Sequence, residues 1–427
     1  MKYALINPPW SYDGSIYFGC REHHLPLEFG YARQLLEQAG HEALLLDAPL
    51  LGLTLDDLRA QLARFRPDFT VITTAPTYLF WRCPPPELRV PREAAAYLRD
   101  LAGTLVVVGP HASTTPEATL TKIGADAAVL GECEEVLPKL AGDWHAITGL
   151  ACREGDTVRV QGAPQAADMG ALPALHWPVE FLRPHHHHHH RFDEPRHGLG
   201  AELEASRGCP YACSFCAKDN FRDKFRRRPN EVVLAELDDL IAKGVGYVYF
   251  VDEIFLPNRE LLEEVAQRGI RFGIQTRIDL WKPELLDLLG HAGCVSIEAG
   301  IESISDLGRR LLHKNCKLDS DELKARLLHA RRTVPFVQAS LLDSQVDDPV
   351  AVECWRQELI AHGVWANKPV PMFPYPGSPG YTEIWGPPDT RAWERAHEHY
   401  LAQFSDFSDI QEERPRSLPE LEGAAPQ

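Results

Sequence analysis

The sequence predicts two α/β units, a connector between them and a short tail. Short apolar runs alternate with amphipathic helical patterns over residues 1–145 and again over residues 200–385. Such alternation is typical of parallel sheets with helical crossovers, and 427 residues suffice for two domains with separate cores. Residues 146–199 are expected to form a linker with a small hairpin, and residues 386–427 a helix followed by a disordered tail.

The first unit is predicted to be a flavodoxin-like, doubly wound parallel sheet. Its expected helices, residues 30–39, 55–65 and 92–101, are each closed by a nearby glycine or proline. Ligands of such folds bind at the carboxyl ends of the strands. The expected strands are Tyr3–Ile6, Ala43–Leu46, Phe69–Thr73, Leu105–Val108 and Ala127–Leu130.

The ends of four of these strands are rich in small and hydroxyl residues. Small residues let a large planar ligand approach the backbone, and hydroxyls can meet its amide edges. The segments are Pro8-Pro9, Thr74-Ala75-Pro76-Thr77, Gly109-Pro110-His111 and Gly131-Glu132.

The connector contains six consecutive histidines, His185–His190. Such a run binds nickel or zinc opportunistically, and its internal position argues against a purification tag. The sequence leaves open whether the run is native, functional or engineered. We expect an exposed linker here and assign it no catalytic metal.

The second unit repeats strand and helix six times. In barrels of this kind the chemistry gathers at the C-terminal strand ends, and those ends are polar here. The expected strands are Ala201–Ala205, Tyr247–Val251, Gly273–Thr276, Val295–Ala299, Phe336–Leu341 and Asn367–Pro371.

A loop after the first of these strands carries three cysteines, Cys209, Cys213 and Cys216, at Cys-x3-Cys-x2-Cys spacing. Thiolates are the normal ligands of iron–sulfur clusters, and three ligands leave one iron of a cubane open. A structural zinc site would need four ligands, usually in two pairs, and a disulfide would need an oxidising compartment. The sequence favours a [4Fe-4S] cluster over both alternatives.

This loop resembles the hallmark of the radical S-adenosylmethionine (SAM) superfamily, including the aromatic Phe215 before the last cysteine. The resemblance implies a partial (β/α)6 barrel in which SAM chelates the open iron. Reduction of the cluster by an electron donor such as flavodoxin or ferredoxin would then cleave SAM to methionine and a 5′-deoxyadenosyl radical. It further implies SAM-contacting residues at the strand ends, namely Phe215, Asp252, Glu253, Gln275, Arg277, Glu298, Gly300, Glu302 and Ser340.

The first unit resembles the cobalamin-binding domain that precedes many radical SAM domains. The resemblance implies that cobalamin contacts Pro8, Pro9, Thr74, Ala75, Pro76, Thr77, Gly109, Pro110, His111, Gly131 and Glu132. The Asp-x-His-x-x-Gly motif, which supplies a histidine to cobalt, is absent. We therefore expect cobalamin without an axial histidine, with His111 at the edge of the ligand.

Beyond the barrel, residues 389–404 are expected to form a helix over its mouth. Arg277, His397, His399 and Tyr400 are the candidates for substrate contact, although half-buried packing is an alternative for the last three. Residues 221–228 form a basic run, expected to be a solvated loop that pairs with acidic neighbours. Disorder is expected from Glu412 onward.

The composition limits the partners. A net charge of −17 argues against a nucleic-acid backbone, and no apolar run reaches the length of a membrane span. Ten scattered cysteines and an oxygen-sensitive cluster fit a reducing cytoplasm.

The expected function is that of a cobalamin-dependent radical SAM enzyme, most simply a carbon methyltransferase acting on a small molecule. One alternative is a radical SAM dehydratase, epimerase or rearrangement enzyme with a vestigial cobalamin domain, acting on a sugar-like or natural-product substrate. Another is a non-catalytic metal-binding or regulatory protein. The substrate and the oligomeric state do not follow from the sequence.

Overall fold

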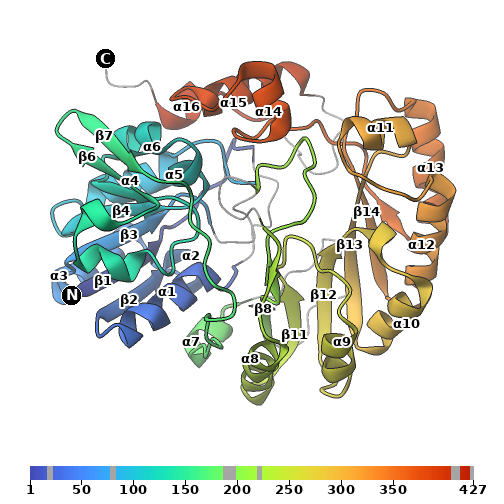
Figure 1. Cartoon of the computed structure of the whole chain (residues 1–427), viewed down its shortest axis with the longest axis horizontal. Coiled ribbons are helices and arrows are strands. Elements are labelled where there is room, and N and C mark those ends of the chain that lie inside the picture. Colours follow the sequence, from blue (N-terminus) through green and yellow to red (C-terminus); the bar gives the residue numbers. More distant parts are fainter. Residues whose placement is uncertain (17–22, 77–82, 186–198, 219–223, 405–413, 424–427) are drawn as a thin grey trace.

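The computed structural model describes residues 1–16, 23–76, 83–185, 199–218, 224–404 and 414–423. Two sheets lie side by side, with three C-terminal helices spanning the top of both (Figure 1). The arrangement agrees with the two predicted α/β units. Of the predicted site residues, Thr77 lies outside the described residues, as do residues 221–223 of the basic run.

The first sheet has the strand order β2-β1-β3-β4-β5-β6-β7. Its five parallel strands are β1 (Lys2–Asn7), β2 (Glu42–Asp47), β3 (Phe69–Thr73), β4 (Thr104–Val108) and β5 (Ala127–Val129). The order 2-1-3-4-5 is the flavodoxin-like one, so the predicted fold class of this unit is confirmed.

The helices of this unit are α1 (Leu27–Gln38), α2 (Ala48–Leu51), α3 (Leu55–Phe65), α4 (Arg89–Leu98), α5 (Pro110–Thr114) and α6 (Pro116–Ile123). The 3-10 turns η2 (Leu137–Ala141) and η3 (Trp144–Ala146) follow β5. The sequence analysis did not predict α5 and α6, because both are short and begin with a proline that reads equally well as part of a loop.

The hairpin predicted in the connector exists as β6 (Leu150–Glu154) and β7 (Thr157–Gln161). It pairs antiparallel with β5 and so extends the first sheet by two strands. We propose that the first domain therefore runs through this hairpin, with the tether beginning after it. One short helix, α7 (Val179–Leu182), lies in that tether.

The second sheet has six parallel strands in the order β15-β14-β13-β12-β11-β8. They are β8 (Leu199–Leu203), β11 (Val245–Phe250), β12 (Arg271–Thr276), β13 (Cys294–Glu302), β14 (Phe336–Leu341) and β15 (Trp365–Ala366). Among the described residues the two edge strands do not pair, so the sheet is the predicted partial barrel.

Helices cover the outer face of this curved sheet (Figure 1). They are α8 (Asn230–Ala242), α9 (Arg259–Ala266), α10 (Pro283–His291), α12 (Ser320–Thr333) and α13 (Pro349–Ala361), with the short α11 (Asp306–Leu311) and the 3-10 turn η5 (Ile278–Leu280) at the mouth. A third, two-stranded sheet joins β9 (Ser206–Arg207) to β10 (Arg226–Arg227) antiparallel. This ribbon brackets the cysteine loop.

The C-terminal helices are α14 (Pro379–Trp385), α15 (Ala392–Gln403) and α16 (Leu418–Glu422). The predicted helix over the barrel mouth is therefore present as α15. The prediction of disorder from Glu412 onward is corrected over α16, where Glu422 accepts a hydrogen bond from the Leu88 backbone nitrogen at 2.8 Å and pairs with Lys122 at 3.1 Å. These long-range contacts fix the position of a segment whose Pro-, Glu- and Ala-rich composition by itself predicts disorder.

Candidate functional site

The cysteine loop is held by backbone hydrogen bonds from three directions. The Gly208 nitrogen donates to the Glu253 carboxylate at 2.7 Å, and the Ser214 nitrogen donates to the Leu312 carbonyl at 3.0 Å. From the C-terminal segment, the Gly380 nitrogen donates to the Ser214 carbonyl at 2.7 Å. The loop is thus fixed by the barrel and by the start of α14, which makes it a rigid platform for a ligand.

The three cysteines of the loop are half-buried and form no disulfide among the described residues. Their sulfur atoms do not all lie within 4.8 Å of one another, since the only described His, Cys, Asp or Glu group that close is a different one. A single zinc ion, with Zn–S bonds of about 2.3 Å, would draw its ligands closer than this. The wider spacing fits a polynuclear cluster, whose irons are ligated at separate corners.

Asp252 and Glu253 are adjacent in the sequence but have different hydrogen-bond partners. Asp252 is buried and accepts hydrogen bonds from the Ala205 nitrogen at 2.9 Å and from the Ser206 hydroxyl. Burial raises the pKa of Asp252 to about 7, against these hydrogen bonds. Its carboxylate therefore supports the strand before the cysteine loop, and Glu253, which is half-buried, remains the candidate for a SAM contact.

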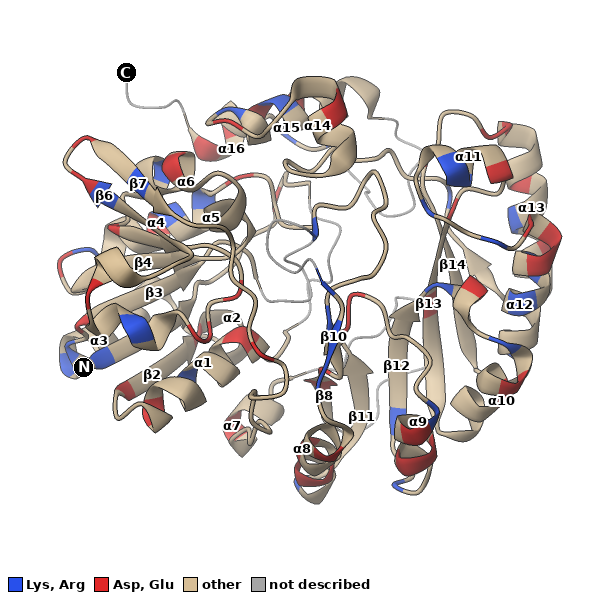
Figure 2. Cartoon of the chain, viewed as in Figure 1, with Lys and Arg blue, Asp and Glu red and all other residues tan. Residues whose placement is uncertain are grey.

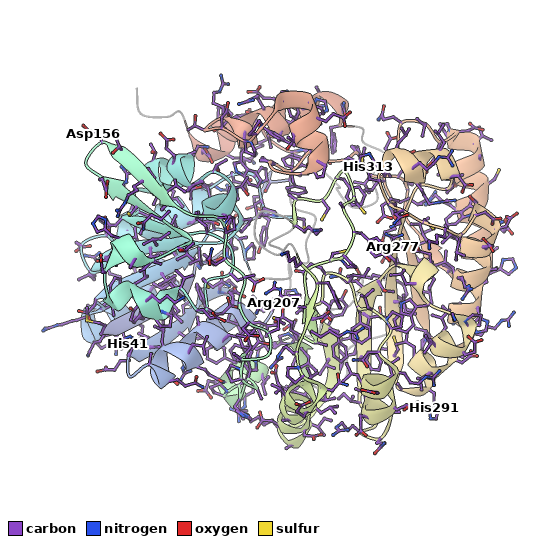
Figure 3. All side chains as sticks on the ribbon, viewed as in Figure 1. His41, Asp156, Arg207, Arg277, His291 and His313 are labelled. Carbon is purple, nitrogen blue, oxygen red and sulfur yellow. The ribbon has the colours of Figure 1, made fainter. Side chains whose placement is uncertain are left out.

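Arg277 lies over the ring of Tyr211, with its guanidinium carbon 3.9 Å from the ring centroid. Asp279 orients the guanidinium through two hydrogen bonds, at 3.1 and 2.9 Å. The remaining terminal nitrogen, Nη1, is buried and has no hydrogen-bond partner in the part of the chain that the structure describes. A fixed guanidinium with a spare donor beside the cysteine loop suits a carboxylate ligand (Figure 3).

Glu302 adopts a left-handed backbone conformation with φ of 62°. Strain of this kind in a non-glycine residue is concentrated at functional sites. The Glu302 carboxylate pairs with buried Lys314, and a Cβ added to Gly300 would lie 2.4 Å from Glu302 Oε1. Gly300 is therefore needed for Glu302 to fold back beside the strand end.

Of the other predicted SAM contacts, Phe215 lies in the cysteine loop, and Gln275, Glu298 and Ser340 lie on neighbouring strands. Gln275 donates to the Asp252 carbonyl at 2.7 Å, and Ser340 accepts a hydrogen bond from Gln338 at 2.9 Å. Glu298 and Phe215 are half-buried. Because β12, β13 and β14 are adjacent, Gln275, Glu298 and Gln338 share one register row across the sheet.

The carboxyl edge of the first sheet is built from close backbone approaches. Gly109 has φ of 118°, and a Cβ there would lie 2.5 Å from Thr74 Oγ1. That hydroxyl is buried and has no hydrogen-bond partner among the described residues, so it is available to a ligand amide. Ala75, Pro76, Pro110 and Pro8 are also buried, whereas Pro9 is half-buried. This narrow, weakly polar cradle fits the edge of a corrin ring.

Two predicted cobalamin contacts at this edge have other partners. The Glu132 carboxylate accepts hydrogen bonds from Arg207 at 3.0 Å, from Arg226 and from the Ala167 nitrogen at 2.8 Å. These protein partners occupy the carboxylate, whereas we expected it to contact cobalamin. A Cβ on Gly131 would meet the Gln165 backbone at 2.2 Å, which shows that the connector covers this glycine.

His111 is buried and stacks on Trp393 of α15, with ring centroids 4.1 Å apart. Burial lowers its pKa to about 3, and its Nε2 lies 3.4 Å from the Pro86 carbonyl. The imidazole is thus neutral and covered by the C-terminal helix. His111 therefore packs beneath α15, and its expected contact with the edge of the ligand stays a prediction.

The candidates for substrate contact on α15 lie in different environments. His397 and Tyr400 are buried, and burial lowers the pKa of His397 to about 4. His399 lies on the more exposed side, 3.0 Å from Gln403, and packs edge-on against Trp385. The alternative of structural packing fits His397 and Tyr400 better than a substrate role does.

The sequence analysis missed three residues of this site. Tyr211 lies inside the cysteine motif, Asp279 follows Arg277 by two residues, and Lys314 lies beyond α11. Only the short separation of Asp279 from Arg277 gave a sequence signal. Lys314 reaches the site through the fold, and no local pattern marks it.

The comparisons with known proteins divide the chain in the same way. Residues 20–141 match the model of the B12 binding domain, and residues 203–341 match that of the radical SAM superfamily. The anaerobic magnesium-protoporphyrin IX monomethyl ester cyclase of Cereibacter sphaeroides is 27% identical over 374 residues, which are 80% of this chain and 56% of the relative. The hopanoid C-2 methylase of Rhodopseudomonas palustris is 32% identical over 175 residues, or 37% of this chain and 33% of the relative.

Among solved structures, the fold is similar to that of the radical SAM methyltransferase TsrM from Kitasatospora setae, with tryptophan and a SAM analogue bound. The TM-score is 0.68 at 20% identity, covering 90% of this chain and 75% of the other. This likeness shows the fold. The chain spans just over half the length of the cyclase that it matches.

Proposed function

Since this chain is a radical SAM protein with an N-terminal B12 binding domain, we propose that it transfers a methyl group to a carbon atom of a small molecule. When bound, the cluster and SAM supply radical chemistry and cobalamin supplies the methyl group. The protein's own contribution is to place the three groups around one substrate and to keep water out.

One observation carries this proposal: the carboxyl edges of the two sheets are in contact at the cysteine loop. Arg207, two residues before Cys209, pairs with Glu132 and Glu134 of the first domain at 3.0 and 2.6 Å. All three side chains are fully buried. A cofactor on the first sheet and one on the cysteine loop would therefore be neighbours, as methyl transfer to a radical carbon requires.

The residues of the barrel mouth have distinct roles in this proposal. Cys209, Cys213 and Cys216 would ligate the cluster. The spare guanidinium donor of Arg277 would hold the SAM carboxylate, and the half-buried carboxylate of Glu253 would hold its ammonium group. Glu302, fixed by Lys314, would accept hydrogen bonds from the ribose hydroxyls.

The first sheet would bind cobalamin through backbone and the Thr74 hydroxyl, without a histidine on cobalt. The cover of Trp393 over His111 and the absence of the Asp-x-His-x-x-Gly motif both support this arrangement. We also propose an electron donor such as flavodoxin or ferredoxin, and a cytoplasmic location, because a reduced cluster needs both. No helix in the described part of the chain is long and apolar enough to cross a membrane.

The proposal is tested by the products that the anaerobically reconstituted protein makes from SAM. A methyltransferase forms S-adenosylhomocysteine together with 5′-deoxyadenosine, whereas 5′-deoxyadenosine alone would contradict methyl transfer. The second outcome would favour radical chemistry without methylation, a class suggested by the similarity to a cyclase. The triple variant Cys209/Cys213/Cys216→Ala should lose the cluster iron and both products.

A further inference from the structure

A second constellation of metal-binding side chains lies where the two domains and the tether meet. His24 precedes α1 of the first domain, Glu202 is on β8 of the barrel, and His185 follows α7 of the tether. Their ligand atoms all lie within 4.8 Å of one another. This His24–His185–Glu202 triad is separate from the cysteine loop and plays no part in the proposed methyl transfer.

The three side chains of the triad lie close together and are shielded from solvent. His24 Nδ1 lies 2.6 Å from Glu202 Oε1, and His185 Nε2 lies 2.8 Å from Glu202 Oε2. The three residues are 4%, 1% and 1% exposed. His185 was expected in an exposed linker, and its burial corrects that expectation. Its second nitrogen, Nδ1, is buried and has no hydrogen-bond partner within the described segments.

A further buried carboxyl group lies near the triad. Asp47, at the end of β2, interacts electrostatically with His24 and Glu202. Two imidazoles and a carboxylate enclosed together offer their lone pairs to one point in the interior, which is the arrangement that a metal ion requires.

We propose that His24, His185, Glu202 and one water molecule bind a zinc ion that joins the two domains and the tether. Two imidazoles and one carboxylate are a zinc ligand set, with bonds of about 2.0–2.2 Å. Neighbouring ligand atoms around a tetrahedral ion lie about 3.3 Å apart. The two histidine–Glu202 separations of 2.6 and 2.8 Å would therefore open by about half an ångström when the ion binds.

The ion would have a structural role. All three ligands are enclosed, so no substrate can reach the metal, and each ligand comes from a different segment of the chain. Binding of zinc would therefore stabilise the docking of the cobalamin domain against the barrel. The rest of the histidine run is not needed for this site.

The test uses the full chain with its cluster reconstituted, so that the cysteines are occupied. His186–His190 are replaced by serine, which leaves His185 and removes opportunistic binding. We expect one zinc ion per chain after dialysis, and a zinc-dependent rise in the melting temperature. X-ray absorption at the zinc edge should show nitrogen and oxygen ligands alone.

Glu202→Gln and His24→Gln should each lower the zinc affinity at least tenfold, whereas His291→Gln, at an exposed position on α10, should not change it (Figure 3). The proposal is overturned if the serine-replaced chain retains no zinc, if the zinc edge shows sulfur ligands, or if zinc affinity is the same in Glu202→Gln. Because the absorption measurement uses unsubstituted triad residues, it decides the question even if a triad variant fails to fold.

Discussion

The two carboxyl edges that meet in this molecule are built from opposite chemistry. At the first sheet, the segments after β3 and β4 offer backbone, small residues and one buried hydroxyl, that of Thr74. At the barrel, the strand ends carry Glu253, Arg277 and Glu302, each positioned by a hydrogen bond or an ion pair. The first edge suits a large ligand with many amides, and the second suits a small zwitterion.

The two domains also differ in where their charged side chains lie. Glu132 and Glu134 of the first domain follow β5 and pair with Arg207 and Arg226 of the β9–β10 ribbon. Figure 2 shows this basic ribbon between the two sheets. The acidic groups of the cobalamin domain thus serve the cysteine loop, and the ligand edge stays nearly uncharged.

The largest expected effect comes from removing Arg207, whose ion pairs join the edges of the two sheets. Arg207→Met would leave Glu132, Glu134 and Glu204 buried without their shared partner, and removal of one member of a buried ion pair costs about 3–5 kcal/mol. Urea unfolding of the two-domain chain measures this loss. Arg33→Met, which removes an exposed pair with Glu37, should cost less than about 1 kcal/mol. If both variants lose the same free energy of unfolding, the buried ion pairs of Arg207 contribute no more to stability than an exposed pair does.

The second prediction concerns the nearly uncharged edge of the first sheet, where a substitution adds a methyl group. Gly109→Ala would place a Cβ 2.5 Å from Thr74 Oγ1 at a positive φ, so cobalamin affinity should fall about a hundredfold, or about 2.7 kcal/mol. Equilibrium dialysis, followed by the visible absorption of cobalamin, measures it. Gly124→Ala is the matched control, because Gly124 also has positive φ but faces open space. If both variants bind cobalamin as the parent does, the edge is not the binding surface.

At the charged edge, a conservative substitution should have a smaller effect. Arg277→Lys keeps the charge but loses the planar fork to Asp279 and the stacking on Tyr211. SAM affinity of the reconstituted protein should fall about tenfold, which is about 1.4 kcal/mol. Arg271→Lys, exposed at the other end of β12, should leave it unchanged. An unchanged affinity in Arg277→Lys would remove Arg277 from the SAM site.

The pH dependence of stability has opposite signs at the two edges. Folded Asp252 keeps a proton up to a pKa of about 7, which the unfolded chain releases near 3.8, so its contribution to stability falls as the pH rises through this window. His111 has a folded pKa of about 3 against an ordinary 6.5, so its contribution falls as the pH decreases from 6.5.

Between pH 4.5 and 6.5 the two contributions therefore oppose each other, each by up to about 1.4 kcal/mol per pH unit. Relative to the parent, Asp252→Asn should make the unfolding free energy rise more steeply with pH, and His111→Gln should make it fall. Urea titrations at several pH values measure both slopes. Two variants with the same slope would contradict the burial that the structure assigns to one of the groups.

The sequence by itself determined the order of elements and the cluster ligands. Strand and helix alternation is a local property of hydrophobic periodicity, and the cysteine spacing is fixed within eight residues, so both can be seen without the fold. The different environments of Asp252 and Glu253 have a local cause too, since adjacent side chains of an extended chain point in opposite directions.

Only the tertiary structure decided which polar groups face a ligand and which face each other. Glu132 and His111 follow strand ends as a binding residue should, yet Arg226 and Trp393, from segments 94 and 282 positions further along the chain, occupy them. Likewise, Lys314 joins Glu302, and His24, His185 and Glu202 converge from three segments. Partners so distant in sequence leave no local pattern, because their pairing is set by the docking of whole elements.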